Sequence, residues 1–227
     1  MQIEYLDHVA LWVSDRDALA DFLTKHVGMH VIERTDAFTL VGADARRGKL
    51  TLFAAEGERE AGALSRVGVA VTNLDRALAA LPKGIELELH ADGSMSFDAP
   101  SGLQLALVEA NGFSDYDLHD VALRVPDPRR TFNELSELGF QVEDGALYAG
   151  QAEIVLERGG RSQPEHPLLN HFGLRVESAG DHIKEAEERG LEIAEVKDAE
   201  NTYAVFIWGP DRIKLEYVEH KASFSLA

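Results

Sequence analysis

Four stretches of the sequence are versions of one another, about 50 to 60 residues apart, and such a period indicates a fold assembled from one repeated supersecondary unit. The two clearest copies are LDHVALWV, beginning at Leu6, and LHDVALRV, beginning at Leu118. Two looser copies begin at Leu64 and Leu169. The repeat also allows equivalent positions to be compared within one chain.

Each unit reads as a short apolar strand, a helix and three further strands. In the first unit, Leu19, Phe22, Leu23 and Val27 recur at helical spacing, and Gly28 is placed to end the helix. Strand-like runs follow at residues 29–35, 37–43 and 49–56, and the other helices centre on residues 74–81, 128–138 and 183–189. The sequence therefore predicts four βαβββ units.

The two faces of the opening strands differ, because alternate side chains of a strand point to opposite sides. One face is apolar in all four units, which predicts packing against the helices. The other face starts with a polar residue and continues with a small one. These pairs are His8 and Ala10, Arg66 and Gly68, Asp120 and Ala122, and His171 and Gly173. This pattern predicts a lined cavity, and the alternative is a solvent-exposed face.

Four βαβββ units with a His in the opening strand, and a run from Pro210 to Glu216 in the last unit, resemble the vicinal oxygen chelate superfamily. This superfamily includes glyoxalase I, bleomycin resistance proteins and type I extradiol dioxygenases, and the resemblance extends from about Tyr5 to Glu219. It implies an α+β fold in which the four units pair into two cupped mixed sheets, with a divalent metal in a cup. Four units in one chain are most similar to the extradiol dioxygenases. Residues 1–112 would hold units one and two, and residues 113–227 units three and four.

The resemblance implies metal ligands at the polar position of an opening strand and at one position of a closing strand. Glu216 matches the closing position in the fourth unit, whereas the second unit has Ala106 there and the first and third units have apolar residues near Leu52 and Ile154. The candidates are His8, Asp120, His171 and Glu216, with Arg66 as an odd member. His119 adjoins the ligand position, but strand alternation predicts that it points the other way.

Two pairings of the units remain open. Pairing in sequence order would give Asp120, His171 and Glu216 as the ligands. Pairing of the first unit with the fourth would give His8, His171 and Glu216, a set of two His and one carboxylate. Arg66 and Asp120 would then share the other cup and neutralise one another, which offsets the cost of burying a lone charge. We favour this second arrangement.

The family resemblance further implies an Fe(II)-dependent dioxygenase, with Mn(II) as an alternative ion, that cleaves the ring of a catechol-like substrate. Extradiol enzymes carry an acid–base His before the final Glu, but the segment from Asn201 to Pro210 contains none. Tyr203 lies nearest to this role and is the catalytic candidate, with a pocket-lining aromatic as the alternative reading. A non-catalytic, resistance-type binding protein or a glyoxalase-like enzyme is the alternative function.

The chain has 40 acidic and 22 basic residues, a formal charge of −18, and no cysteine. This charge repels nucleic acid and anionic membranes, and thiolate ligands and disulfides are excluded. Neither a membrane-spanning run nor a signal peptide is visible, so we expect a cytoplasmic protein. The expected partners are a small aromatic substrate and dioxygen, with no nucleic acid and no membrane, and a homo-oligomer is possible.

Overall fold

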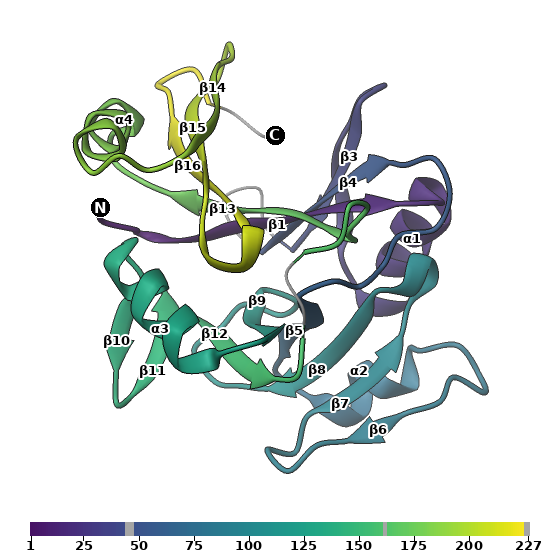
Figure 1. Cartoon of the computed structure of the whole chain (residues 1–227). Helices are drawn as coiled ribbons and strands as arrows, with labels where there is room; N and C mark the ends of the chain where they lie inside the picture. The colour runs from purple at the N-terminus through teal and green to yellow at the C-terminus, as the bar shows by residue number, and fades with distance from the viewer. Residues whose placement is uncertain (44–47, 161–162, 225–227) are drawn as a thin grey trace.

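A computed structural model describes residues 1–43, 48–160 and 163–224, and the remaining residues, including 225–227 of the expected second half, lie outside the description. The described residues form two eight-stranded mixed sheets with helices packed against them (Figure 1). Each repeat contributes one opening strand, one α-helix and three closing strands. The prediction of an α+β fold built from four βαβββ units in two sheets is confirmed.

The first and fourth units build one sheet, in the strand order β14-β15-β16-β13-β1-β4-β3-β2. The first unit consists of β1 (Tyr5–Val13), α1 (Arg16–Phe22), a π-helical turn (Leu23–Val27), β2 (His30–Arg34), β3 (Phe38–Gly42) and β4 (Lys49–Ala54). The fourth unit consists of β13 (Leu169–Arg175), α4 (Ala179–Glu188), β14 (Ile193–Asp198), β15 (Thr202–Trp208), a 3₁₀ turn (Pro210–Arg212) and β16 (Lys214–His220).

The second and third units build the other sheet, in the order β10-β11-β12-β9-β5-β8-β7-β6. The second unit consists of β5 (Leu64–Val71), α2 (Leu74–Ala79), β6 (Glu88–Leu89), β7 (Met95–Asp98), a 3₁₀ turn (Pro100–Gly102) and β8 (Gln104–Glu109). The third unit consists of β9 (Leu118–Val125), α3 (Pro128–Glu137), β10 (Gln141–Glu143), β11 (Ala146–Ala149) and β12 (Ala152–Arg158). Each sheet thus combines one unit from residues 1–112 with one from residues 113–227.

Local sequence signals explain where the first helix begins and ends. The Asp15 carboxylate accepts a hydrogen bond from the Ala18 N–H at 2.9 Å, which satisfies one of the free donors of the first turn. Gly28 has a φ of 98° directly after the π-helical turn, a left-handed conformation that glycine adopts without a steric penalty. The chain is thereby returned toward the sheet to form β2.

The two sheets share one hydrophobic core. Leu11, Val69, Leu123 and Leu174, one from the apolar face of each opening strand, belong to a single buried cluster. The hydroxyl of Tyr217 on β16 donates to the carbonyl of Leu138, directly after α3, at 2.8 Å, which links the fourth unit to the third. Because the apolar faces meet in this core, the polar faces of the opening strands lie on the far side of each sheet. No helix within the described ranges is long and apolar enough to cross a membrane.

Candidate metal centre

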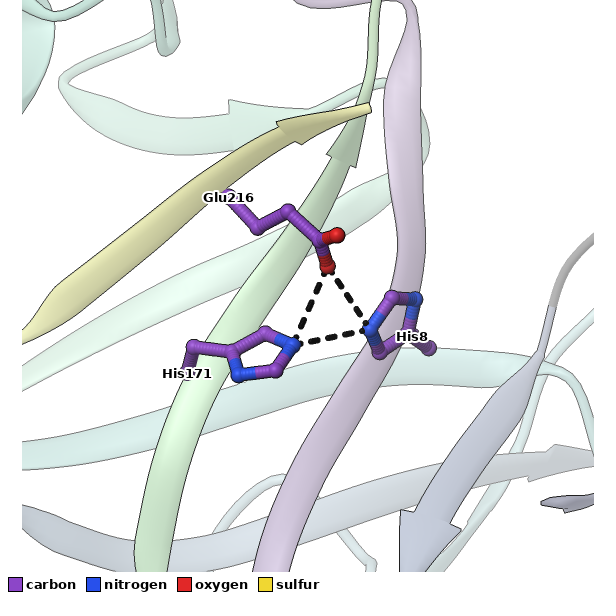
Figure 2. Close-up of side chains that lie close together, drawn as sticks. All are labelled: His8, His171 and Glu216. Atoms are coloured by element: carbon purple, nitrogen blue, oxygen red, sulfur yellow. Dashed lines mark hydrogen bonds and ion pairs between the residues drawn. The ribbon is translucent and has the colours of Figure 1, made fainter. Parts of the chain in front are cut away.

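Three neighbouring strands bring the side chains of His8, His171 and Glu216 together. Strands β1 and β13 pair antiparallel, with Ala10 opposite His171 and His8 opposite Gly173. Strand β16 pairs parallel to β13 on its other side, with Glu216 opposite Gly173. Figure 2 shows the three side chains converging from β1, β13 and β16. The polar positions of the first and fourth units therefore meet in one sheet.

The ligand-type atoms of these residues form a nearly equilateral triangle. The Nε2 atoms of His8 and His171 are 3.1 Å apart. The Glu216 Oε2 atom lies 3.2 Å from the His8 Nε2 and 3.0 Å from the His171 Nε2 (Figure 2). His171 and Glu216 are only 5% and 8% exposed. Among the described residues this is a group of three His and carboxylate side chains that could hold a metal ion.

The size of the triangle fits an ion with open coordination positions. Ligand atoms about 2.1 Å from an octahedral ion are about 3.0 Å apart, because neighbouring ligands subtend a right angle. The corresponding separation around a tetrahedral ion is about 3.4 Å. The observed separations of 3.0 to 3.2 Å match one face of an octahedron. Two His and one carboxylate on one face leave the opposite face free, as in non-haem Fe(II) sites.

Two β-bulges orient the imidazole rings. The ladder between β1 and β13 skips Asp7 on one strand and Asn170 on the other, each immediately before a His. The Nδ1 atom of His8 lies 2.9 Å from the Asp7 Oδ2, and that of His171 lies 3.0 Å from the Asn170 Oδ1. A proton on each Nδ1 leaves Nε2 free as a metal ligand, which is the usual role of such outer partners.

Asp7 and Asn170 did not emerge from the sequence as functional residues. Strict alternation places both on the opposite face from their His, and only a bulge re-aims them. The available signal was the polar residue directly before each His, as Asp7-His8 and Asn170-His171. Asp7 is itself buried and also contacts the Lys49 ammonium at 2.8 Å and the His220 Nε2 at 3.4 Å.

Hydrogen bonds and charges within the cluster favour the positively charged form of His8, which carries a proton on both ring nitrogens. Burial lowers the pKa of His8, but hydrogen bonds to Asp7 and Glu216 outweigh it and raise the pKa to about 9. Burial lowers the pKa of His171, and its bond to Glu216 does not compensate. Burial raises the pKa of Glu216, but the bonds to both His hold it below its ordinary value. A cation bound between the three residues would replace the His8 proton.

A glycine provides the space for His8. A Cβ atom at Gly173 would lie 2.1 Å from the His8 Cε1 atom, so the imidazole ring occupies the place of the missing side chain. In the other sheet, a Cβ at Gly68 would lie 1.9 Å from the Asp120 Oδ2. The two glycines that accompany polar positions in the repeat are therefore required by the side chain on the opposite strand.

Tyr203 does not join the cluster. It pairs with Glu219, whereas Phe206 pairs with Glu216 in a continuous ladder between β15 and β16. Three residues apart on a strand, Tyr203 and Phe206 face opposite sides of the sheet. The ring centroid of Phe206 lies 5.1 Å from that of His171, so the face with Phe206 is the one that carries the cluster.

The register places two closing-strand positions one residue away from Leu52 and Ile154, where the sequence predicts them. Ala10 and Gly173 hold the same place in the repeat, and Ala10 pairs with Thr51 as Gly173 pairs with Glu216. Thr51, not Leu52, is therefore the equivalent of Glu216 in the first unit. Since Ala122 pairs with Val155, the third unit has Val155 there and not Ile154. A shift by one residue moves a side chain to the other face of the strand.

The second sheet holds an ion pair at the equivalent positions. The Arg66 Nη2 atom donates to the Asp120 Oδ1 at 2.9 Å, and the two side chains are 10% and 5% exposed. The expectation that His119 points away is wrong, because a bulge in the pairing of β5 with β9 re-aims it. Its Nδ1 lies 3.1 Å from the Asp120 Oδ2. Burial raises the pKa of Asp120, but His119 and Arg66 hold it below its usual value.

Comparison with known proteins gives a family and a fold. The family model "Glyoxalase/Bleomycin resistance protein/Dioxygenase superfamily" matches residues 5–146, more than half of the chain. Glyoxalase I from Zea mays superimposes with a TM-score of 0.78 at 16% identity, over 95% of this chain and 92% of that one. A Bacillus subtilis protein provisionally described as a dioxygenase gives 0.76 at 16% identity, over 96% of this chain and 86% of that one. At such identities the likeness concerns the fold. A search of curated proteins finds no match.

We expect the stability of the ion-free protein to fall as the pH rises from about 6.5 to 9.5. The folded state raises the pKa of His8 to about 9. The resulting stabilisation is complete below the unfolded pKa of about 6.5 and is lost as the pH passes the folded pKa. The expected loss in unfolding free energy is on the order of 3 kcal/mol. Urea unfolding of chelator-treated protein at several pH values measures it.

His8→Gln should remove this pH dependence, while His30→Gln, at an exposed position on β2 away from the cluster, should retain it. An unchanged slope in His8→Gln would assign the effect to other groups. In the presence of a divalent ion, affinity should increase with pH up to about 9 and then level off, because the ion competes with the His8 proton.

The ion pair of the second sheet should contribute to stability and not to metal binding. Asp120→Ala leaves Arg66 buried without its partner and should cost about 3 to 5 kcal/mol of unfolding free energy. Glu143→Ala, at an exposed position of the same sheet, should cost less than about 0.5 kcal/mol. Mn(II) titration should show binding in Asp120→Ala and loss of binding in His8→Ala. The reverse result would make Asp120 the ligand.

Proposed function

The chain belongs to the glyoxalase/bleomycin resistance protein/dioxygenase superfamily, and on that premise we propose that it is a metal-dependent dioxygenase of extradiol type. The observation that carries the proposal is the facial arrangement of His8, His171 and Glu216. Two neutral imidazoles and one carboxylate suit Fe(II), with Mn(II) as the alternative. The proposed substrate is a catechol-like aromatic compound, with dioxygen as the second substrate.

The surroundings of the cluster support an aromatic substrate. Ring contacts run from Trp12 to Phe53 at 5.3 Å between centroids, and from Phe53 to His171 at 6.4 Å. Phe206 meets His171 edge-on from the other side at 5.1 Å. Aromatic side chains pack favourably against a planar ring in such offset and edge-to-face arrangements. They also limit the access of water to the proposed ion.

The chain's own residues have distinct roles in this proposal. Asp7 and Asn170 accept hydrogen bonds from the Nδ1–H groups and fix both rings with Nε2 directed inward. Glu216 supplies one negative charge, which leaves a divalent site with a net positive charge to attract an ionised hydroxyl group. When bound, Fe(II) supplies adjacent positions at which both catechol oxygens and dioxygen can meet, and a path for electrons between them.

One observation favours a second candidate function. The segment before Glu216 contains no His, and Tyr203 lies on the opposite face of β15. This favours a protein of the resistance type that binds a small aromatic molecule without converting it. A glyoxalase-like site would need further protein ligands, and the equivalents of Glu216 in the other units are Thr51, Ala106 and Val155.

Metal loading and oxygen consumption test the proposal. Protein purified without oxygen or chelators should bind about one Fe(II) per chain, and His171→Ala or Glu216→Ala should abolish stoichiometric binding, because two remaining ligands rarely hold Fe(II) against water. His166→Ala, an exposed His in the loop before β13, is the matched control and should bind normally.

Addition of 4-methylcatechol to the Fe(II) protein should consume one equivalent of dioxygen and produce the strong visible absorbance of a ring-cleaved product. Metal-dependent binding of 4-methylcatechol without oxygen uptake would indicate the binding protein instead. Retention of the ion in Glu216→Ala would contradict the metal site itself.

A further inference from the structure

A lysine faces the proposed metal centre. Lys214 lies on β16 two residues before Glu216 and therefore on the same face of the strand. Its half-buried side chain places the ammonium 5.7 Å from the ring centroids of both Phe206 and Trp208. Cations at this distance over aromatic rings are attracted to them. The carboxylates of Glu195, opposite Phe206 on β14, and of Glu216 act electrostatically on the ammonium. The ammonium and His171 both adjoin the Phe206 ring, so Lys214 is close to the cluster.

Within the described ranges, no carboxylate lies within ion-pair distance of the Lys214 ammonium. Neighbouring cations differ in this respect. Arg212 covers the same Trp208 ring at 4.1 Å but pairs with Glu192 at 2.7 Å. Lys49, on the same side of the sheet, pairs with Asp7 at 2.8 Å. An unpaired, half-buried lysine is notable in a chain with 40 acidic and 22 basic residues.

The position of the Lys214 charge restricts which substituents a bound aromatic substrate can carry. Phe206 adjoins both features, since its ring centroid lies 5.1 Å from that of His171 and 5.7 Å from the Lys214 ammonium. An aromatic molecule held at the cluster would extend along this ring toward the lysine. A neutral, apolar substituent there would remove water from the ammonium without replacing the hydrogen bonds that the water made. An anionic substituent would form a charge-assisted hydrogen bond with the ammonium instead.

We propose that the substrate of the His8–His171–Glu216 site carries an anionic group, such as a carboxylate, and that Lys214 binds this group. The inference rests on the proposed function and adds the class of substrate to it: an aromatic acid with two adjacent hydroxyl groups. Phe206 and Trp208 hold the ammonium in place, and the ring contacts around His171 position the aromatic part.

Matched pairs of ligands test this inference. The Fe(II)-loaded protein, kept without oxygen, is titrated with 3,4-dihydroxybenzoate against 4-methylcatechol, and with 2,3-dihydroxybenzoate against 3-methylcatechol. Each pair differs in a carboxylate or a methyl group at one ring position. Tryptophan fluorescence reports binding, because both tryptophans of the chain, Trp12 and Trp208, adjoin the ring contacts described above. At least one carboxylate should bind about tenfold more tightly than its methyl partner.

Lys214→Gln should reduce this preference to about one, and Lys214→Glu should invert it, while both variants still take up one Fe(II). Arg212→Gln is the matched control, since Arg212 lies on the same Trp208 ring but is paired with Glu192, and it should retain the preference. A preference that persists in Lys214→Gln, or methylcatechols that bind as tightly as the acids, would overturn the inference alone. Failure of every ligand to bind the metal-loaded protein would overturn the proposed function.

Discussion

The antiparallel pairing of β1 with β13 determines the geometry of the whole site. It joins the first unit to the fourth, places His8 and His171 on adjacent strands, and gives Glu216 its place through β16. Two bulges in this ladder turn Asp7 and Asn170 toward the imidazoles. Gly173 leaves the space that the His8 ring fills. Register, bulges and glycine act together, because a slip of one residue would move every side chain to the other face.

The second sheet has the same strand geometry but holds an ion pair in place of the metal-ligand residues. Its opening strands are also bulged, and Gly68 makes space for the side chain opposite, as Gly173 does. There the repeat positions hold Arg66 and Asp120, which neutralise one another in a buried ion pair. Such a pair stabilises only while both partners are present. The repeated unit thus provides two equivalent cups, one with the residues of a metal site and one with a closed pair of charges.

Sequence reasoning reached the units and much of the cluster, and its errors have one cause. The repeat predicted four βαβββ units, because each carries the same apolar strand and helical spacing. It also singled out His8 and His171 through equivalent positions, the family resemblance added Glu216, and the structure brings these three together. Counting alternate residues failed at Asp7, Asn170 and His119, since a bulge cannot be seen in a single strand. The same counting misplaced Leu52 and Ile154 by one position, because register depends on the partner strand.

The protonation of the cluster explains how three such groups can be held together without an ion. Two neutral imidazoles and one carboxylate that face inward would not attract one another strongly, because only Glu216 is charged. The raised pKa of His8 supplies a positive charge between the carboxylates of Asp7 and Glu216. The low pKa of His171 leaves its Nε2 available as an acceptor. The proton thus occupies the place that a divalent ion would take, and binding becomes an exchange of cations at a site whose ligands are already in position.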